Sequence, residues 1–465
     1  MLASIMPTFE HNMASQGNNL MSTLPQNENT QKVTIEARVE SVLLFENAGL
    51  LRLELRAQDK SLQAIISIDA VVKETWDLAQ SLTAESIIKI TGSVSEQTAD
   101  DSRGNVHSAS TAIHVSNLQV IALAEPNLPV PSCCKEKMLM PRADLQERLN
   151  NRILDVRYAA SGAIFKLHSG MCQLVVEFLC SKNFHWIHTP RIISATIPGD
   201  NEYFHLQYFG KDAWLAQSSQ HHKQMALSMD MQRVFEIGPV FRAEVKSSNS
   251  ARHVTEFTVL DIAMAFNDDY YEVVDLVESM LKLYPRAQPF RVGLDEHGKV
   301  PRITFLEAKR ILREELGLAS DDSKNLTDLE EAALGAYFRD SASTDIFTID
   351  KYPAPLRQFN SQANLDSPGF SNTWDTIVRG REICSGSQRI HGYSELCEAM
   401  CAGVCGPSLD PEDEQWQPYL AAFKAGMPPH GGCGLGLNRL LQSFLGLDDV
   451  REVILFPRDI NRLRP

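Results

Sequence analysis

The sequence contains neither a long apolar run nor a leader of the secretory or mitochondrial type. No stretch approaches the roughly 18 to 20 uninterrupted apolar residues that a membrane-spanning helix requires. Residues 1–31 contain no Lys or Arg, whereas signal peptides begin with a basic region and mitochondrial presequences are rich in Arg. We therefore expect a cytoplasmic protein without a membrane segment.

Paired cysteine motifs and the common phosphate-binding loops are also missing. The nine cysteines include no CxxC, and the adjacent Cys133 and Cys134 cannot easily form a disulfide with each other. This usage fits a reducing compartment. The sequence contains neither GxxxxGKS/T nor a strand, GxGxxG and helix unit with an acid downstream, which excludes the most common nucleotide-binding folds.

Basic residues are outnumbered by acidic ones. With 44 Lys and Arg against 59 Asp and Glu, the formal net charge is -15, which excludes a protein that coats nucleic acid without preference. A specific RNA ligand is still compatible with this charge, because such binding follows local basic patches. The 465 residues, 43% hydrophobic and 22% charged, are typical of a soluble protein of two or three domains.

The residues that are present divide the chain into segments. Residues 1–31, rich in Asn, Gln, Ser, Thr and Met, are predicted to be a disordered leader. Residues 32–124 contain five short runs of β-branched alternation, which predict a small β-barrel. An OB-fold that binds nucleic acid is the favoured form, and another small β-domain is the alternative. Residues 125–141, with four prolines, are predicted to be a hinge.

Residues 142–465 are predicted to form a second, larger domain. Apolar residues recur at helical spacing over residues 164–184, and a strand-like segment follows. Strands and helices then alternate irregularly, without a repeat or the βαβ rhythm of a doubly wound sheet. The predicted fold class is therefore α+β, with an N-terminal barrel followed by a domain whose antiparallel sheet is flanked by helices.

One segment of this domain places charged groups on strand faces. Residues 233–266 are predicted to form a strand, a polar loop and a returning strand. Arg242 and Glu244 would share one face, and Phe257 and Asp261 would share one face of the return. An acid within an apolar strand needs a partner, because an unpaired buried charge is costly. A salt bridge between Arg242 and either acid at the sheet rim is the alternative to a binding site.

A glycine-rich run, HGGCGLGLNRL, lies near the C-terminus. Gly432, Gly434 and Gly436 alternate with apolar residues along a predicted strand, so one face is free of side chains and a flat ligand can lie against the backbone. Arg439, in the predicted helix that follows, would reach the phosphate or ring of such a ligand. A glycine-rich run by itself does not specify a nucleotide site.

Together these segments resemble the three motifs of the class II aminoacyl-tRNA synthetases. The first appears as NFHWIHTPRI, the second as FRAE followed by RHVTEFTVLDIAMAF, and the third as GGCGLGLNRL. Two further stretches, AQSSQHHKQ and VRGREICSGSQRIH, are similar to the aspartate subgroup, above all to aspartyl-tRNA synthetases of the eukaryotic cytoplasmic type. The resemblance implies a homodimer with an antiparallel catalytic sheet behind an N-terminal anticodon-binding OB-fold.

The resemblance also implies a reaction. The expected activity is that of an aspartate–tRNA ligase, in which ATP activates L-aspartate as aspartyl-adenylate and the aspartyl group passes to tRNA-Asp. Arg242 and Arg439 would be the catalytic residues, because they would hold the α-phosphate and the outer phosphates as charge builds there. The implied ATP-binding residues are Arg242, Glu244, His253, Phe257, Glu382, Gly436 and Arg439.

Mg2+ and L-aspartate are the other ligands that the resemblance implies. Glu382 and Ser385 would be the Mg2+ ligands, because both offer hard oxygen atoms. Lys223 and Arg389 would bind the side-chain carboxylate, which favours aspartate over asparagine, and Asp261 would bind the ammonium group. The implied aspartate-binding residues are Gln220, Lys223, Asp261, Ser385 and Arg389. For each of them a solvated or salt-bridged side chain is the alternative.

Several positions depart from the pattern of these relatives. The mobile Ser-Glu-Gly-Gly loop that closes over aspartate is replaced by Ile-Pro-Gly-Asp at residues 197–200, which predicts a stiffer lid. Asn438 stands where an acid is usual before the motif-three Arg, and Ala263 stands where Glu is usual. In the barrel, Arg52 replaces the aromatic side chain that stacks on the anticodon, which predicts weaker anticodon binding.

These departures leave two alternatives to a standard aspartate–tRNA ligase. The first is a diverged paralogue that uses the aminoacyl-adenylate or aminoacyl-tRNA in specialised metabolism, or an inhibitor-resistant copy. The second is a non-catalytic binding paralogue, against which the retention of Arg242, Glu382 and Arg439 argues.

Overall fold

The computed structural model describes most of the chain and divides it into two compact units. The described residues are 32–57, 60–97, 110–129, 144–196, 203–243, 251–283, 291–404 and 407–464. The first unit comprises Met1–Ile164 and the second Phe165–Pro465. The predicted leader and most of the predicted hinge lie outside the described residues, and the predicted domain boundaries stay a prediction.

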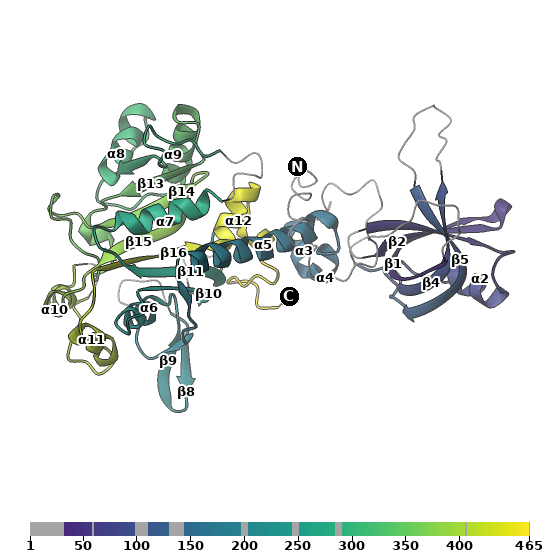
Figure 1. The fold of residues 1–465 in the computed structure, drawn as a ribbon, viewed down its shortest axis with the longest axis horizontal. Helices are drawn as coiled ribbons and strands as arrows, with labels where there is room; N and C mark the ends of the chain where they lie inside the picture. Colours follow the sequence, from purple (N-terminus) through teal and green to yellow (C-terminus); the bar gives the residue numbers. More distant parts are fainter. Residues whose placement is uncertain are drawn as a thin grey trace. The chain divides into compact units, whose positions relative to one another are not determined.

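The first unit contains a closed five-stranded barrel, coloured purple to blue in Figure 1, which confirms the predicted β-barrel. Its strands pair in the order β1-β2-β3-β5-β4. The parallel pairing of β3 with β5 and the antiparallel pairing of β1 with β4 close the barrel. The elements are β1 (Lys32–Phe45), β2 (Leu50–Ala57), β3 (Lys60–Ser67), α2 (Lys73–Gln80), β4 (Ile87–Gln97) and β5 (Ser110–Ala122).

Alternate strand residues fill the barrel interior. Leu51, Leu53 and Leu55 of β2 are fully buried, because successive side chains of a strand point to opposite faces. They pack in one core with Ile66 of β3 and Ile88 of β4. The alternating apolar residues that predicted the strands therefore also form the core of the barrel.

Three helices follow the barrel: α3 (Leu145–Asn150), α4 (Arg152–Asp155) and α5 (Ala159–Ser181). Within the described residues, α5 is the one helix that is long and apolar enough to cross a membrane by length and composition, and 33% of its apolar window is buried. The core helices of soluble proteins pass the same test, and Met171 and Val175 of α5 are buried at helical spacing. The helix is therefore weak evidence for a membrane span.

The second unit is built on an eight-stranded sheet in the order β12-β13-β14-β15-β16-β11-β10-β6. Neighbouring strands from β13 to β10 run antiparallel, as predicted. The edge strands β12 and β6 differ, because each pairs in parallel with its neighbour. The strands are β6 (His185–Trp186), β10 (Arg233–Phe241), β11 (Glu256–Ala265), β12 (Arg302–Thr304), β13 (Ile346–Asp350), β14 (Thr373–Val378), β15 (Arg381–Arg389) and β16 (His430–Gly436).

Helices flank this sheet, which confirms the predicted α+β class (Figure 1). One core cluster joins α6, α10 and α11 to the sheet residues Val234 and Ala263. Another joins α8 and α9 to Phe347 and Ile377. The helices are α6 (Gln220–Leu227), α7 (Tyr271–Leu281), α8 (Phe305–Arg310), α9 (Asp328–Ser341), α10 (Tyr393–Ala402), α11 (Gln417–Lys424) and α12 (Leu437–Leu445), and a small second sheet contains β7 (Ile192–Ile193), β8 (His205–Tyr208) and β9 (Lys211–Leu215).

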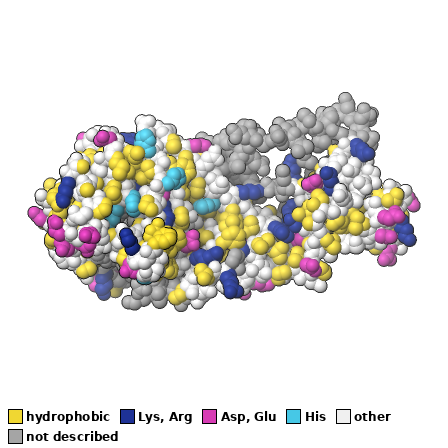
Figure 2. Space-filling view, turned by 90° about the horizontal axis from the view of Figure 1, so that it is seen from below, with side chains coloured by type: hydrophobic (Ala, Val, Ile, Leu, Met, Phe, Trp, Pro, Cys, Tyr) yellow, Lys and Arg dark blue, Asp and Glu magenta, His cyan; other side chains and the backbone are white. Residues whose placement is uncertain are grey.

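The net negative charge is not gathered into one acidic field on the face that Figure 2 shows. Lys and Arg side chains lie there among Asp, Glu and hydrophobic side chains. A mixed surface of this kind leaves room for local basic patches in spite of the net charge.

Candidate active site

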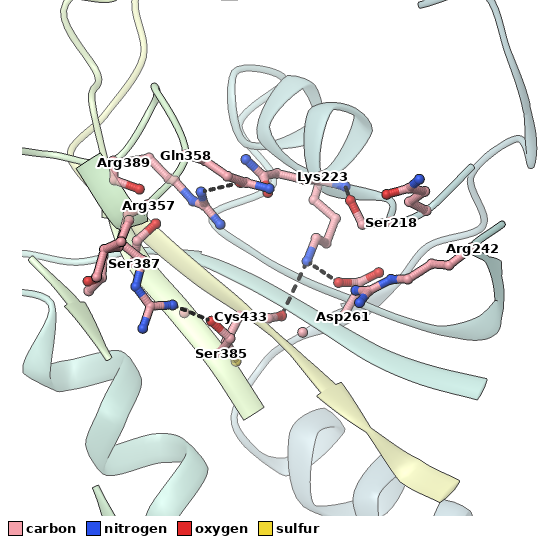
Figure 3. A pocket seen from close by; sticks show the side chains of 17 residues that line it. Ser218, Lys223, Arg242, Asp261, Arg357, Gln358, Ser385, Ser387, Arg389 and Cys433 are labelled. Carbon is pink, nitrogen blue, oxygen red and sulfur yellow. Dashed lines mark hydrogen bonds and ion pairs between the residues drawn. The ribbon is translucent and has the colours of Figure 1, made fainter. Parts of the chain in front are cut away.

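A pocket of about 250 Å3 opens over the middle of the large sheet, where β11, β16 and β15 lie side by side (Figure 3). α6 and residues 356–361 supply further lining residues. Six of the residues that the sequence predicts as ligand-binding line this pocket: Gln220, Lys223, Arg242, Asp261, Ser385 and Arg389. The structure thus brings together side chains that are up to 169 positions apart, between Gln220 and Arg389.

Gly434 lies in β16, the central strand of the three that form the floor of the pocket. In the ladder it pairs with Asp261 of β11 on one side and with Ser385 of β15 on the other. A Cβ atom at this position would lie 3.4 Å from Asp261 Oδ1 and 3.7 Å from Val259 Cγ1. Because glycine has no Cβ atom, the space between the Asp261 carboxylate and the Ser385 hydroxyl stays open to a ligand.

Asp261 and Lys223 form a buried ion pair in the pocket (Figure 3). Lys223 Nζ lies 2.8 Å from Asp261 Oδ1, and it also donates to the backbone oxygens of Ile262 at 3.2 Å and Cys433 at 3.4 Å. Ser219 donates its hydroxyl to Asp261 Oδ2 at 2.8 Å. Burial raises the pKa of Asp261, but Lys223 and Ser219 outweigh burial and the net shift is downward. Asp261 is therefore an anion that holds Lys223 close to the sheet.

Arg389 and Gln220 offer hydrogen-bond donors to the same pocket. Arg389 Nη1 donates to Gln358 Oε1 at 3.3 Å and to Asn360 Oδ1 at 3.0 Å. Gln220 is 8% exposed, and its Nε2 has no hydrogen-bond partner among the described residues. A buried donor of this kind is costly unless a ligand atom accepts from it, so the pocket is suited to a ligand with carboxylate or carbonyl oxygens.

Arg242 lines this pocket and Phe257 lies next to it, as strand alternation predicts. The Arg242 guanidinium carbon is 5.3 Å from the centroid of the Phe257 ring, within the range of a cation–π contact. The Arg242 backbone N–H donates to Thr255 O at 3.0 Å, so the β10–β11 ladder extends past the end of β10. A cation and an aromatic face are therefore presented on one surface.

Arg439 and Gly436 lie at the start of α12, next to Glu382. Arg439 Nη1 donates to the Glu382 backbone oxygen at 3.3 Å. A Cβ atom at Gly436 would lie 3.6 Å from Arg439 Cβ. Asn438, one of the departures, is buried and accepts from the Thr258 backbone N–H at 2.7 Å. Its side chain therefore joins α12 to β11.

A β-bulge brings Glu382 and Ser385 to the same face of the sheet. Two residues three apart on a regular strand point to opposite faces. The β14–β15 register shifts at this point, because Thr376 pairs with Cys384 while the next residue of β14 pairs with Glu382, which leaves Ile383 as the extra residue of a bulge. The predicted pair of metal ligands can thus act on one ligand.

Glu382 stands in a cluster of buried charges. Burial raises its pKa to about 7, with Asp375 and Glu331 adding to the rise and Arg439 and Arg357 opposing it. A divalent cation would favour the ionised carboxylate. Within the parts of the chain that the structure describes, no group of three His, Cys, Asp or Glu side chains converges as a metal cluster. The residues fit Mg2+ if the ion takes further oxygens from phosphate and water.

Arg357, which lines the pocket, and its partner Asp375 are absent from the predicted site. Arg357 forms a bidentate ion pair with Asp375 at 3.0 and 2.5 Å, donates to Ser385 Oγ at 3.1 Å, and lies 3.6 Å from the centroid of the Tyr352 ring. Asp375 lies between Trp374 and Thr376 in β14, so it lacks the purely apolar neighbours that singled out Asp261. Arg357 lies in an irregular segment, where periodicity gives no signal.

Other predicted residues either lie outside the described residues or are described without lining this pocket. Glu244 and the predicted lid, residues 197–200, lie outside the described residues. His253 is half-buried in the segment before β11 and does not line the pocket. Ala263, another of the departures, is buried in the core cluster of α6, α10 and α11.

Comparison with known proteins identifies the family to which this chain belongs. The family of tRNA synthetases class II (D, K and N) matches residues 144–460. The chain is 37% identical over 436 residues to the cytoplasmic aspartate–tRNA ligase of Mus musculus, covering 89% of this chain and 85% of that one. It is 35% identical over 455 residues to the aspartate–tRNA(Asp) ligase of Pyrococcus abyssi, covering 96% and 98%.

Solved structures give the same answer. The aspartyl tRNA synthetase of Entamoeba histolytica superposes with a TM-score of 0.78 at 33% identity, covering 94% of this chain and 90% of that one. The asparaginyl-tRNA synthetase of Pyrococcus horikoshii, complexed with asparaginyl-adenylate, superposes with a TM-score of 0.79 at 27% identity, covering 94% and 97%. With the family match and the sequence relatives, these similarities show that this chain belongs to the class II tRNA synthetases of the D, K and N group.

Proposed function

We propose that the protein is an aspartate–tRNA ligase, which activates L-aspartate with ATP and transfers it to tRNA-Asp. The observation that carries the proposal is the pocket in which Arg389 and Gln220 offer donors while Asp261 offers an anion. An amino acid with an acidic side chain has the complementary groups, a carboxylate and an ammonium. The names of the relatives support the same substrate, and they give no support to a paralogue of specialised metabolism.

In the first step, the α-carboxylate of aspartate attacks the α-phosphorus of ATP and expels pyrophosphate. Asp261 would hold the ammonium group, and Arg389 the side-chain carboxylate, so that the attacking oxygen is positioned for an in-line displacement. Arg242, whose cation lies over Phe257, would stabilise the negative charge that builds on the α-phosphate. Phe257 would stack on the adenine ring.

The outer phosphates would lie toward α12 and the start of β15. Arg439 would bind them there, beside Glu382, and His253 would add a further contact. Glu382 and Ser385 would hold Mg2+, which would supply charge neutralisation to the leaving pyrophosphate. Burial raises the pKa of Glu382 to about 7 although Arg439 and Arg357 oppose the rise, and a bound Mg2+ would favour the ionised carboxylate further.

In the second step, a terminal ribose hydroxyl of tRNA-Asp attacks the activated carbonyl carbon, and AMP leaves. The barrel would bind the anticodon, as OB-folds bind single-stranded nucleic acid. A homodimer is supported by the edge strand β6, where Trp186 is 46% exposed. A cytoplasmic location is supported by relatives named as cytoplasmic.

Amino-acid-dependent exchange of pyrophosphate into ATP tests this proposal. Each of the twenty amino acids is assayed with and without tRNA, followed by charging of tRNA-Asp and tRNA-Asn. We expect exchange with L-aspartate and charging of tRNA-Asp. Exchange without charging would favour a paralogue with another acceptor, and absence of exchange with every amino acid would refute the ligase assignment.

A further inference from the structure

The Arg389 guanidinium is held by two amide side chains of one neighbouring segment. Its Nη1 donates to Asn360 Oδ1 at 3.0 Å and to Gln358 Oε1 at 3.3 Å, and the second bond is drawn in Figure 3. The backbones are joined at the same place, because Ser361 forms a bridge with Arg389 and the Ile390 N–H donates to Asn360 O at 3.0 Å. The amides and the guanidinium are thus fixed to each other by main chain and side chain.

The orientation of the Asn360 amide is determined by its surroundings. Asn360 is 1% exposed, and its oxygen must face Arg389, because a guanidinium offers donors only. Tyr419 lies beside the amide and donates to Gln224 Oε1 at 2.9 Å. Burial raises the pKa of Tyr419 to about 12, and Asn360 and Arg389 oppose the rise. Asn360 Nδ2 is buried and has no hydrogen-bond partner among the described residues, so the hydrogen bond that orients the amide is the one its oxygen accepts from Arg389.

Two other cations that line the pocket, Lys223 and Arg357, are held by acids. Lys223 pairs with Asp261, and Arg357 forms a bidentate pair with Asp375. Carboxylate partners supply a full negative charge, whereas an amide oxygen accepts a hydrogen bond without formal charge. The two amides thus orient Arg389 and add no anion beside it.

We infer that Asn360, together with Gln358, is a positioning residue that selects an acidic amino acid over its amide. Neutral acceptors fix the direction of the Arg389 guanidinium and preserve its attraction for a substrate carboxylate. An acid in the same place would pair with Arg389 and repel that carboxylate. The inference rests on the proposed function and names residues that determine its specificity.

The variant Asn360→Asp tests the inference, because it keeps the acceptor oxygen and adds one negative charge. Exchange is measured at saturating ATP with varied L-aspartate, and then at saturating aspartate with varied ATP. We expect the KM for aspartate to rise at least about tenfold while the KM for ATP stays within about twofold. The preference for aspartate over asparagine, measured as the ratio of kcat/KM, falls by a similar factor.

Gln388→Glu is the matched control. Gln388 precedes Arg389 in β15, does not line the pocket, and accepts from Asn372 Nδ2 at 2.7 Å through its Oε1. It therefore receives the same added charge one residue away while keeping its acceptor. Both KM values are expected to match those of the unchanged chain.

Three outcomes overturn the inference. The first is an unchanged KM for aspartate in Asn360→Asp, and the second is an equal rise in both KM values, which would indicate general damage to the fold. The third is an equal effect of Gln388→Glu. If Asn360→Asp does not fold, Gln358→Glu carries the same expected result. Failure of the unchanged chain to exchange with aspartate would instead overturn the proposed function itself.

Discussion

At the scale of single residues, the site is a set of charges that are each held by a defined partner. Asp261 is paired with Lys223, Arg357 with Asp375, and Arg389 with amide oxygens. Holding a charge in this way costs desolvation, and buried pairs repay that cost only when their hydrogen bonds are complete. The residues that contact a substrate are therefore inseparable from those that hold them in place.

Arg389→Gln tests the assignment of the substrate carboxylate at this scale. The variant keeps donors but loses the cation, so we expect aspartate-dependent exchange to be abolished, or reduced by about tenfold to a hundredfold, because an ionic hydrogen bond is worth about 1.5 to 3 kcal/mol. ATP binding, followed by calorimetry, should be unchanged. Near-normal exchange in the variant would refute the pocket assignment.

Glu382→Gln tests the acidic group beside Arg439 through stability. Because the folded-state pKa of Glu382 is raised to about 7, the folded protein binds more protons than the unfolded chain between about pH 4.5 and 7, so stability falls as pH rises through that window. The neutral variant avoids this loss. We expect its unfolding free energy to exceed that of the unchanged chain by about 1 to 3 kcal/mol at pH 8, with little difference at pH 4.

Urea denaturation without Mg2+ at both pH values measures this difference. Added Mg2+ and ATP should stabilise the unchanged chain more than the variant, since binding to the folded state alone stabilises it. A variant that is less stable than the unchanged chain at pH 8 would contradict the expected sign. Whichever protein is more stable, Glu382→Gln should lose exchange activity.

At the scale of elements, glycine is required for different physical reasons at positions in two neighbouring strands. Gly386 of β15 packs against the fully buried Trp374, so a Cβ atom would clash with the indole ring. Gly434 of β16 faces the open pocket, and a Cβ atom there would meet only Asp261 and Val259 at ordinary contact distance. One glycine therefore allows close packing, and the other leaves room for a ligand.

Paired alanine substitutions test this division. We expect Gly386→Ala to lower the unfolding free energy by about 1 to 3 kcal/mol through overpacking. Gly434→Ala should leave the unfolding free energy within about 0.5 kcal/mol and raise the KM for aspartate instead. Urea denaturation and exchange kinetics on both variants separate the two effects. Equal destabilisation by the two substitutions would contradict the division.

At the scale of the whole molecule, a tRNA ligand must be bound in spite of a net charge of -15. The sequence predicts that the barrel surface around Arg52 binds the tRNA anticodon weakly. The Arg52 side chain is 39% exposed, its Nε lies 3.6 Å from Glu54 Oε1, and its guanidinium is 5.6 Å from the centroid of the Phe45 ring. Glu54 thus partly offsets the positive charge of Arg52, and residue 52 itself offers no aromatic ring for stacking on a base.

Arg52→Phe tests whether this position contacts a base. A stacking ring is worth about 1 to 3 kcal/mol per base, so we expect tRNA-Asp to bind at least about fivefold more tightly, as measured by filter binding at fixed salt. Aspartate-dependent exchange without tRNA should not change. Unaltered tRNA affinity would show that Arg52 is not at the anticodon.

Local patterns were sufficient for the elements and for much of the site. A period of two predicted the barrel strands and placed Arg242, Phe257 and Asp261 on one surface, because side-chain alternation depends only on neighbours in the chain. Alternating glycines likewise predicted an open strand face around Gly434. The alternation of side chains along a strand does not depend on how the rest of the chain is arranged.

The tertiary structure alone decided which charges meet. Lys223, predicted to face the substrate, is held by Asp261 because α6 packs over β11, and Arg357 reaches Asp375 from an irregular segment with no periodic signal. The bulge at Ile383 that aligns Glu382 with Ser385 also depends on pairing with β14. Pairing energies between residues far apart in sequence arise only after the sheet has formed, so no local pattern contains them.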